Sequence, residues 1–448
     1  MYIYFYTVFW GFFAVLDGIG EYFYWGVEVI DELNVKLQPL IDRIVKTIEL
    51  SARNSLIQGH YAKAPIAQLT DMVLERAAAM AVSDVHFEPR EKELFIRFRI
   101  DGRLRLMCRL PGALNAYLIS YLKLMTGMDI AEKRLPQDGS VLYGEKRLDI
   151  RASSIPTVEG EKVVLRLLGS AGRLMTLDQM GFSMGNLTKF KQLIQSAGGI
   201  ITITGPVNSG KSTLLYAVLN HLNRGDVNIV TVEDPVEMKL PGINQMQVNQ
   251  KAGMTFAVGL RAVLRQDPDV VMVGEIRDEV TAQEAVRAAL TGHLVLTTLH
   301  TADASGVPAR LIDMGVSPSM LAITLLAGTA QRLVRRICPH CAEEYRPESN
   351  SLEAVMLGSR FHSGIKLRRG RGCSRCGNSG YSGRTALHEI MAVNDDIKTL
   401  IARGEAGLKL KRLLRMNGMK TMQDDAREKI LDGTTTAQEA WRVLNGIS

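Results

Sequence analysis

The spacing of apolar and polar residues changes several times along the chain, and each change predicts a different kind of element. Apolar residues recur every three or four positions from Asp31 to Leu56 and again from Ile66 to Met80, as on one face of a helix. Pro39 stands inside the first stretch, where a proline interrupts a helix that extends to both sides of it. Two amphipathic helices are therefore expected in the first part of the chain.

Alternating residues come after these two helices. Asp84–Glu88 and Leu94–Ile100 alternate between polar and apolar side chains, and Asp101-Gly102 behind them is typical of a tight hairpin turn. The second helix, these strands and the residues as far as Leu168 form a unit of about a hundred residues, which predicts a small α/β domain. Its remaining elements are one helix and two strands, Ala113–Met125, Leu148–Arg151 and Lys162–Leu168.

The middle of the chain alternates short apolar strands with longer helical stretches. Such alternation predicts a mainly parallel sheet with helices on both faces, because parallel neighbours need a crossover connection. The predicted strands are Ile200–Thr204, Asn228–Val232, Val270–Val273 and Leu294–Thr298. From Glu389 to the end of the chain the spacing is helical.

These changes of pattern divide the 448 residues into seven predicted segments. In chain order they are an aromatic apolar segment of unknown role (1–30), a helical linker (31–65), the smaller α/β domain (66–170), a linker (171–185), the α/β core (186–335), a four-cysteine module (336–386) and a helical region (387–448). The first segment contains no Lys or Arg, so it lacks the basic start of a secretory signal. An interfacial anchor, a docking segment and a misassigned start all stay open for it.

Composition describes a globular chain with a sizeable core, since 46% of its residues are hydrophobic and 23% are charged. The formal net charge is +7, and the stretch from Ala330 to Thr385 by itself has a net charge of +7. A basic surface there would meet nucleic acid, a membrane surface or an acidic partner, and a merely solvated face is the alternative. Five cysteines are too few for a disulfide scaffold in a chain of this length.

A phosphate-loop pattern, G-x-x-x-x-G-K-[ST], comes directly after the strand Ile200–Thr204 and precedes a helical stretch. The two glycines let successive backbone N–H groups point at phosphate oxygens, and Asn208 tolerates left-handed backbone better than most residues. Lys211 would reach the β- and γ-phosphates, and the Ser212 hydroxyl would bind Mg²⁺. The predicted nucleotide-binding residues are Gly205, Pro206, Val207, Asn208, Ser209, Gly210, Lys211, Ser212 and Thr213.

Acidic and histidine residues follow or flank the predicted core strands in the sequence. Glu233-Asp234-Pro235-Val236-Glu237 comes after one strand, and Glu275 comes just after Val270–Val273. Carboxylates at the carboxyl ends of parallel strands lie beside the nucleotide, where they can orient a water molecule or hold Mg²⁺. His293 and His300 stand at opposite ends of another strand, where either a γ-phosphate contact or a structural role is open.

Four of the five cysteines form two C-x-x-C pairs, Cys338 with Cys341 and Cys373 with Cys376. Four thiolates suit a closed tetrahedral Zn²⁺ site, and a redox role for two such pairs is the weaker alternative. Cys108 stands alone and is expected to be a small buried side chain.

Taken together, these motifs resemble the ATPases of type II secretion and type IV pilus assembly, from about Ile66 to the end of the chain. The resemblance includes the phosphate loop, the acidic segment ending at Glu237, and the strand-and-acid segment ending at Gly274-Glu275-Ile276-Arg277-Asp278. It also includes the segments Thr291-Gly292-His293, Thr298-Leu299-His300-Thr301, Ala330-Gln331-Arg332-Leu333, Asp84-Val85-His86-Phe87-Glu88, Arg134-Leu135-Pro136-Gln137-Asp138-Gly139 and Gly160-Glu161-Lys162. The four-cysteine module resembles the assembly and secretion branch.

The resemblance implies a RecA-like core behind a PAS-like domain, and a homo-hexameric motor on the cytoplasmic face of the inner membrane. It implies ATP, Mg²⁺ and Zn²⁺ as ligands, an inner-membrane platform protein among the partners, and no nucleic acid. Glu237 is implied as the catalytic base and Glu275 as a magnesium ligand, with His293 and His300 near the γ-phosphate. The arginines implied to complete the site are Arg99, Arg134 and Arg151.

Three features depart from the family's pattern. Val207-Asn208 replaces the usual Thr-Gly, Ser140 stands where an Arg is usual, and the aromatic segment is expected to replace the family's large N-terminal docking domain, if that domain is not missing.

Two other functions stay open. An ATP-driven nucleic-acid translocase would also use a hexamer, a zinc module and a basic patch. A regulator that binds ATP without hydrolysing it is the third class, and the intact Glu237 and Glu275 argue against it. The filament or secreted substrate, the direction of the motor and the order of subunit firing do not follow from the sequence.

Overall fold

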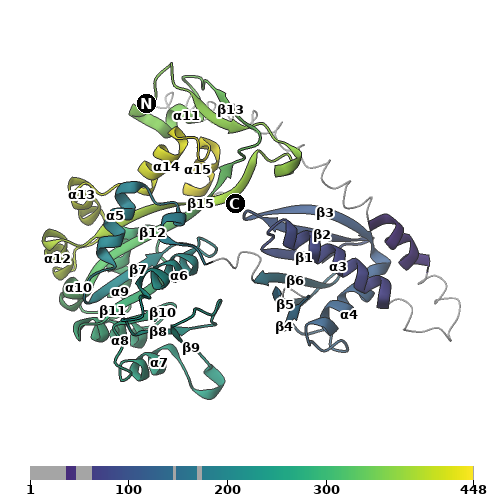
Figure 1. Cartoon of the computed structure of the whole chain (residues 1–448), viewed down its shortest axis with the longest axis horizontal. Helices are drawn as coiled ribbons and strands as arrows, with labels where there is room; N and C mark the ends of the chain where they lie inside the picture. Colours follow the sequence, from purple (N-terminus) through teal and green to yellow (C-terminus); the bar gives the residue numbers. More distant parts are fainter. Residues whose placement is uncertain (1–36, 47–62, 145–147, 169–173, 447–448) are drawn as a thin grey trace, which may run out of the picture. The chain divides into compact units, whose positions relative to one another are not determined.

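The computed structural model describes residues 37–46, 63–144, 148–168 and 174–446, and the predicted segment 1–30 lies outside them. The chain divides into two compact units (Figure 1). The first covers Met1–Gly172 with Arg371–Gly380, and the second covers Arg173–Gly370 with Tyr381–Ser448. Among the described helices, none combines the length and apolarity that crossing a bilayer requires.

The first unit is built on a six-stranded antiparallel sheet with the order β3-β2-β1-β6-β5-β4. β2 alternates between buried and half-buried residues, and β1 next to it is buried throughout. Asp101 and Gly102 both have positive φ, as a two-residue hairpin turn between β2 and β3 requires. The elements are α3 (Lys63–Ala79), β1 (Asp84–Pro89), β2 (Glu93–Ile100), β3 (Arg103–Pro111), α4 (Asn115–Met125), β4 (Gln137–Tyr143), β5 (Leu148–Thr157) and β6 (Gly160–Leu168).

The structure contains the predicted small α/β domain, and its PAS-like character remains a prediction. The part of the first predicted helix that is described is helical over 37–46, and it includes Pro39. The edge strand β4 did not stand out in the sequence, because it mixes Gly, Ser and Asp with apolar residues that are half-buried or exposed.

The second unit contains a seven-stranded sheet with the order β15-β12-β7-β11-β10-β8-β9. All neighbours are parallel except β12 and β15, which confirms the predicted mainly parallel sheet. The strands are β7 (Gly199–Thr204), β8 (Ile229–Glu233), β9 (Asn244–Gln247), β10 (Val270–Val273), β11 (Leu294–Leu299), β12 (Leu325–Ile337) and β15 (Tyr381–Ala392). The helices along this part are α5 (Met184–Leu193), α6 (Lys211–Leu222), α7 (Phe256–Val263), α8 (Glu279–Leu290), α9 (Val307–Asp313) and α10 (Pro318–Thr324).

Helices cover both faces of this sheet, and the strand residues divide between two cores because successive side chains point to opposite faces. Ile200 and Val271 pack in the core that includes α7 and α8. Their neighbours Ile201 and Met272 pack in the core that includes α5 and α6. Both sides of each central strand are therefore buried, which explains their continuous apolar sequence.

The helical prediction from Glu389 onward is wrong for its first residues. Glu389–Ala392 belong to β15, which pairs with β12 in a long antiparallel ladder. Leu387, Ile390 and Met391 have helical spacing, but all three are buried against the sheet. The predicted boundary at 335/336 also falls inside β12, so the four-cysteine module interrupts a β-hairpin of the core.

The connection between β12 and β15 contains β13 (Ala342–Tyr345), α11 (Leu352–Leu357) and β14 (Leu367–Gly370). β13 and β14 form a separate two-stranded antiparallel sheet. Behind β15 the chain is helical as predicted, with α12 (Asp395–Ala402), α13 (Leu408–Met416), α14 (Met422–Leu431) and α15 (Ala437–Leu444).

A buried ion pair joins α15 to β12. The carboxylate of Glu439 lies 2.7 Å from Arg335 and 2.7 Å from Arg442, and the Glu439 side chain is 1% exposed. Burial by itself would raise the pKa of Glu439, but hydrogen bonds from Arg442 and Arg335 lower it to about 2. The Arg335 guanidinium also lies over the ring of Tyr381, 4.0 Å from its centroid. The pair therefore stabilises the packing of the last helix on the core.

We expect Glu439→Gln to lower the free energy of unfolding by about 3–5 kcal/mol, because Arg335 would keep a buried charge without its partner. Urea unfolding followed by circular dichroism measures this loss. Asp395→Asn is the control, since Asp395 and Lys398 form an exposed pair that should contribute little.

The pH dependence checks the same pair. The folded pKa of about 2 lies below the unfolded value of 4.5, so the stabilisation is present above pH 4.5 and is lost as the pH falls toward 2. Glu439→Gln should remove this part of the acid sensitivity. Equal acid sensitivity of the variant and the wild type would contradict the assignment.

Candidate functional site

The phosphate loop connects the buried strand β7 to α6, as the sequence predicted. Gly205, Asn208 and Gly210 have φ values of +156°, +64° and +86°. Asn208 therefore adopts the left-handed conformation that was expected of it, and Gly210 caps the amino end of α6. The loop turns back on itself so that the helix begins directly at Lys211.

The two glycines also need their small size, which the motif alone did not reveal. A Cβ on Gly205 would lie 2.5 Å from the carbonyl oxygen of Gln331, and one on Gly210 would lie 2.7 Å from its Nε2. The same Nε2 donates a hydrogen bond to the carbonyl of Ser209 at 2.7 Å. Gln331 on β12 thus holds the phosphate loop in place. The sequence signal that could have indicated this role was its position in the family segment Ala330-Gln331-Arg332-Leu333.

Lys211 and Ser209 give the loop the donors that a phosphate needs. The Lys211 ammonium donates to the carbonyls of Gly205 and Pro206 at 2.8 and 3.0 Å. Burial lowers the pKa of Lys211, and the carboxylate of Glu275 opposes this shift. The Ser209 hydroxyl is buried and has no hydrogen-bond partner within the described chain. A cation and an unpartnered donor in a loop of N–H groups fit a phosphate ligand.

Glu275 and His300 lie together at the carboxyl ends of β10 and β11. Glu275 lies 2.6 Å from Arg277 and 3.8 Å from the Nε2 of His300. The Thr298 hydroxyl donates to the Gly274 carbonyl at 2.8 Å, which ties the two strand ends to each other. The structure therefore brings Glu275 and His300 into one cluster.

Glu237 lies beside the phosphate-loop helix. The Ser212 hydroxyl donates to a carboxylate oxygen of Glu237 at 3.3 Å. Glu237 is exposed, whereas Glu233 at the end of β8 is buried. Of the two glutamates in the acidic segment, only Glu237 is therefore open to water and to the hydroxyl that was predicted to bind Mg²⁺.

His293 is not brought to the phosphate loop within one chain. β11 pairs with β7 in parallel from Leu294 opposite Gly199, so His293 lies just before the amino end of the strand. Its Nδ1 lies 2.9 Å from the Ala288 carbonyl and 3.0 Å from the Thr291 hydroxyl, at the carboxyl end of α8. The register separates the two histidines by the length of the strand, about 20 Å.

The three predicted arginines lie in the first unit. Arg99 on β2 forms an ion pair with Asp84 at 3.5 Å. Arg134 is 88% exposed and pairs with Glu132 at 2.9 Å. Arg151 lies on β5, opposite Ser140 of β4. That these side chains complete a nucleotide site stays a prediction.

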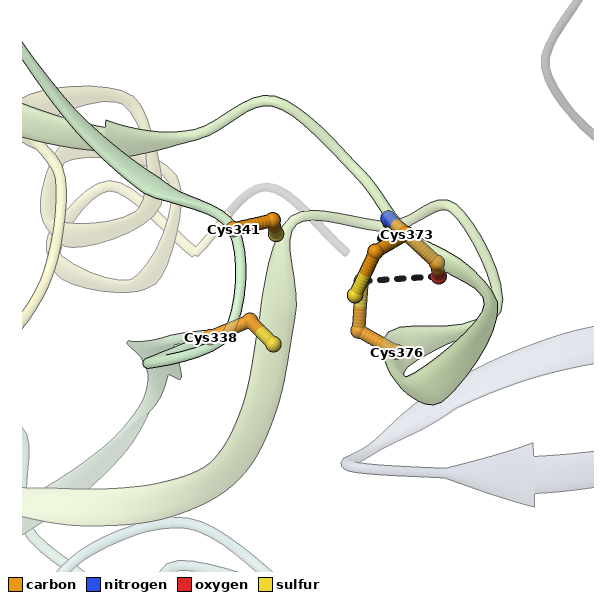
Figure 2. A group of neighbouring side chains, drawn as sticks. All are labelled: Cys338, Cys341, Cys373 and Cys376. Carbon is orange, nitrogen blue, oxygen red and sulfur yellow. Dashed lines mark hydrogen bonds between the residues drawn. The ribbon is translucent and has the colours of Figure 1, made fainter.

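The four cysteines of the two C-x-x-C pairs gather in one cluster, although about thirty residues of chain separate the pairs (Figure 2). Their sulfur atoms all lie within 4.8 Å of one another, and three of the four side chains are buried. The Sγ of Cys376 also accepts hydrogen bonds from the backbone N–H groups of Cys373 and Gly380, at 3.2 and 3.3 Å. Four sulfurs at these separations, stabilised by backbone donors, suit a tetrahedral metal ion.

Curated proteins similar to this chain share much of its length. Residues 60–442 match the family described as Type II/IV secretion system protein. The type IV pilus assembly ATPase PilB of Thermus thermophilus is 48% identical over 370 residues, which are 82% of this chain and 42% of that protein. The type II secretion system ATPase E of Vibrio cholerae is 46% identical over 382 residues, which are 85% of this chain and 75% of that protein.

Solved structures share the fold. The pilus retraction motor PilT with bound ADP is 24% identical, with a TM-score of 0.56 over 82% of this chain and 94% of its own. The ATPase DotB of Yersinia pseudotuberculosis is 21% identical, with a TM-score of 0.63 over 85% of this chain and 94% of its own. The family rests on the sequence matches, which confirm the resemblance drawn from the motifs. Because one family description spans residues 60–442 and curated relatives reach 48% identity, this chain belongs to the Type II/IV secretion system protein family, as a P-loop ATPase.

Proposed function

We propose that this chain is the subunit of a hexameric motor that hydrolyses ATP to drive the assembly of a type IV pilus or a type II secretion pseudopilus. The observation that carries the proposal is the clustering of Lys211, Ser212, Glu237 and Glu275 around one phosphate loop. The names of the similar proteins support the cellular role, since they belong to type IV pilus assembly and type II secretion. The chain spans 42% of the length of the pilus assembly ATPase that it matches.

The residues in and around the phosphate loop would have different roles in phosphoryl transfer. The backbone N–H groups and Lys211 bind the phosphates and offset their charge. Ser212 and Glu275 would hold Mg²⁺, which supplies charge neutralisation at the transferred phosphate when it is bound. Glu237 orients the attacking water and accepts its proton, because its carboxylate is exposed beside Ser212.

His300, and arginines from the first unit, would act on the γ-phosphate. His300 lies near Glu275, so a contact of its imidazole with the γ-phosphate would differ between the ATP-bound and the ADP-bound site. Arg99, Arg134 and Arg151 are the proposed residues that stabilise negative charge at the transferred group. His293 lies at the other end of β11, so it would act on a nucleotide only if a neighbouring subunit of the hexamer brought that nucleotide close to it.

The motor would work at the cytoplasmic face of the inner membrane, against a platform protein. This location is inferred from the pilus and secretion roles of the similar proteins. The basic stretch from Ala330 to Thr385 favours one alternative, an ATP-driven nucleic-acid translocase, which an ATPase assay with and without DNA separates from the motor.

We expect Lys211→Ala to lower steady-state ATP hydrolysis at least a hundredfold, since it removes the cation that contacts the phosphates. The assay uses wild type beside the variant, each with and without membrane-platform extract and with and without DNA. For the motor, the extract should raise wild-type turnover and DNA should not. Turnover raised by DNA alone, with a steep salt dependence, would instead favour the translocase.

We further propose that the four-cysteine cluster holds a structural zinc ion. Its ligands would be Cys338, Cys341, Cys373 and Cys376, and the ion would close the module between β12 and β15. Cys108 is excluded as a ligand by its position, since it is buried on β3 and the clustered sulfur atoms are those of the other four cysteines.

The purified chain should therefore contain about one zinc ion per polypeptide, measured by plasma mass spectrometry. Cys341→Ser and Cys373→Ser should each lower the zinc content and the melting temperature, whereas Cys108→Ser should leave the zinc content unchanged. The assignment would be contradicted if the wild-type chain were free of zinc after purification without chelators. It would also be contradicted if Cys108→Ser lost zinc while Cys341→Ser and Cys373→Ser kept it.

A further inference from the structure

A buried hydroxyl joins the phosphate-loop helix to the acidic loop after β8. Tyr216 lies on α6, one helical turn after Ser212, and is 4% exposed. Its hydroxyl donates a hydrogen bond to the Glu233 carboxylate and accepts one from the backbone N–H of Glu237, with N and O 3.1 Å apart. One oxygen atom therefore contacts both ends of the segment that leads from the buried acid to the exposed one.

Glu233 anchors this hydroxyl and is itself held by further donors. Its carboxylate also accepts hydrogen bonds from the Thr231 hydroxyl at 2.7 Å and from the Gln245 amide at 2.9 Å. A carboxylate only accepts, so these three donors take up most of its capacity and leave it unsuited to act on water. Burial and the hydrogen bond to Glu233 raise the pKa of Tyr216, which keeps the hydroxyl protonated.

Two glutamines of β9 hold the same loop from the other side. The Gln245 amide donates to the Met238 carbonyl at 3.0 Å and accepts from the Leu240 N–H at 2.7 Å. Gln247 accepts from the Val236 N–H at 3.2 Å. Side chains thus fix the loop at several backbone positions along 236–240, where an unsupported exposed loop would bond to water.

We propose that Tyr216 is a positioning residue for ATP hydrolysis, an inference that rests on the proposed function of this site. Its hydroxyl fixes the backbone of Glu237 relative to Ser212, so that the carboxylate lies ready beside the phosphate loop before the reaction begins. A reacting group contributes most when it needs no rearrangement in the reaction step. Gln245 acts on the same loop through Glu233, Met238 and Leu240.

Tyr216→Phe tests this role, because it removes the hydroxyl and keeps the ring. We expect kcat for ATP to fall about tenfold while KM stays within about twofold, as for the loss of a group that acts mainly in the transition state. Tyr345→Phe is the matched control: the Tyr345 hydroxyl also donates to a buried carboxylate, that of Glu353 at 2.7 Å, and it lies in the module between β12 and β15. Its kcat should equal that of the wild type.

A second variant and a second readout separate positioning from stability. Gln245→Met removes a second support of the loop, so its effect on kcat combined with Tyr216→Phe should be smaller than the product of the two single effects. Amide hydrogen exchange of a peptide that covers residues 234–240 should become faster in both variants and stay unchanged in Tyr345→Phe. This exchange is measured without turnover.

The outcomes distinguish the inference from the function on which it rests. If wild type hydrolyses ATP but Tyr216→Phe keeps kcat within twofold, or if the two single effects multiply, the inference is overturned and the motor stands. If wild type does not hydrolyse ATP, the proposed function fails, and unchanged exchange at 234–240 in Tyr216→Phe then overturns the positioning role as well. Faster exchange together with a selective loss of kcat supports it.

Discussion

The parallel register of β7, β11, β10 and β8 is the constraint on which the site depends. These strands are buried on both faces, so a shift of register by one residue would move every side chain to the wrong core. The shared register puts the strand ends Thr204, Leu299, Val273 and Glu233 along one edge of the sheet. Every residue that we assign to phosphate chemistry in the second unit, apart from His293, comes after one of these ends.

Hydrogen bonds then join the strand ends into a frame. The backbone N–H of Thr301 donates to the Thr204 hydroxyl at 2.7 Å, which fixes the segment after His300 to the start of the phosphate loop. Gln331 supports the loop from β12, and Tyr216 links α6 to the acidic loop. Sheet, loop and helix thus hold the proposed catalytic residues in place, as electrostatic catalysis at this site would require.

The phosphate loop could be predicted from sequence because its strand, glycines and lysine are neighbours in the chain. The β12–β15 pairing could not, because its partners are separated by the four-cysteine module and the spacing of Leu387, Ile390 and Met391 also fits a helix. The contacts of Tyr216 with Glu233 and Glu237 depend on tertiary packing between residues far apart in sequence. The pattern placed the two histidines at opposite ends of a strand, but only the register shows which end faces the loop.

The measurement that tests the account most directly compares ATP bound and ATP hydrolysed per chain for the wild type and Glu275→Gln. The Glu275→Gln substitution keeps the size of the side chain and removes its charge beside the phosphate loop. The account predicts that the variant retains bound ATP and loses turnover, because Lys211 and the backbone N–H groups would still bind the phosphates, whereas Glu275 would hold Mg²⁺ for the hydrolysis step. Turnover equal to that of the wild type would contradict the assignment of the site.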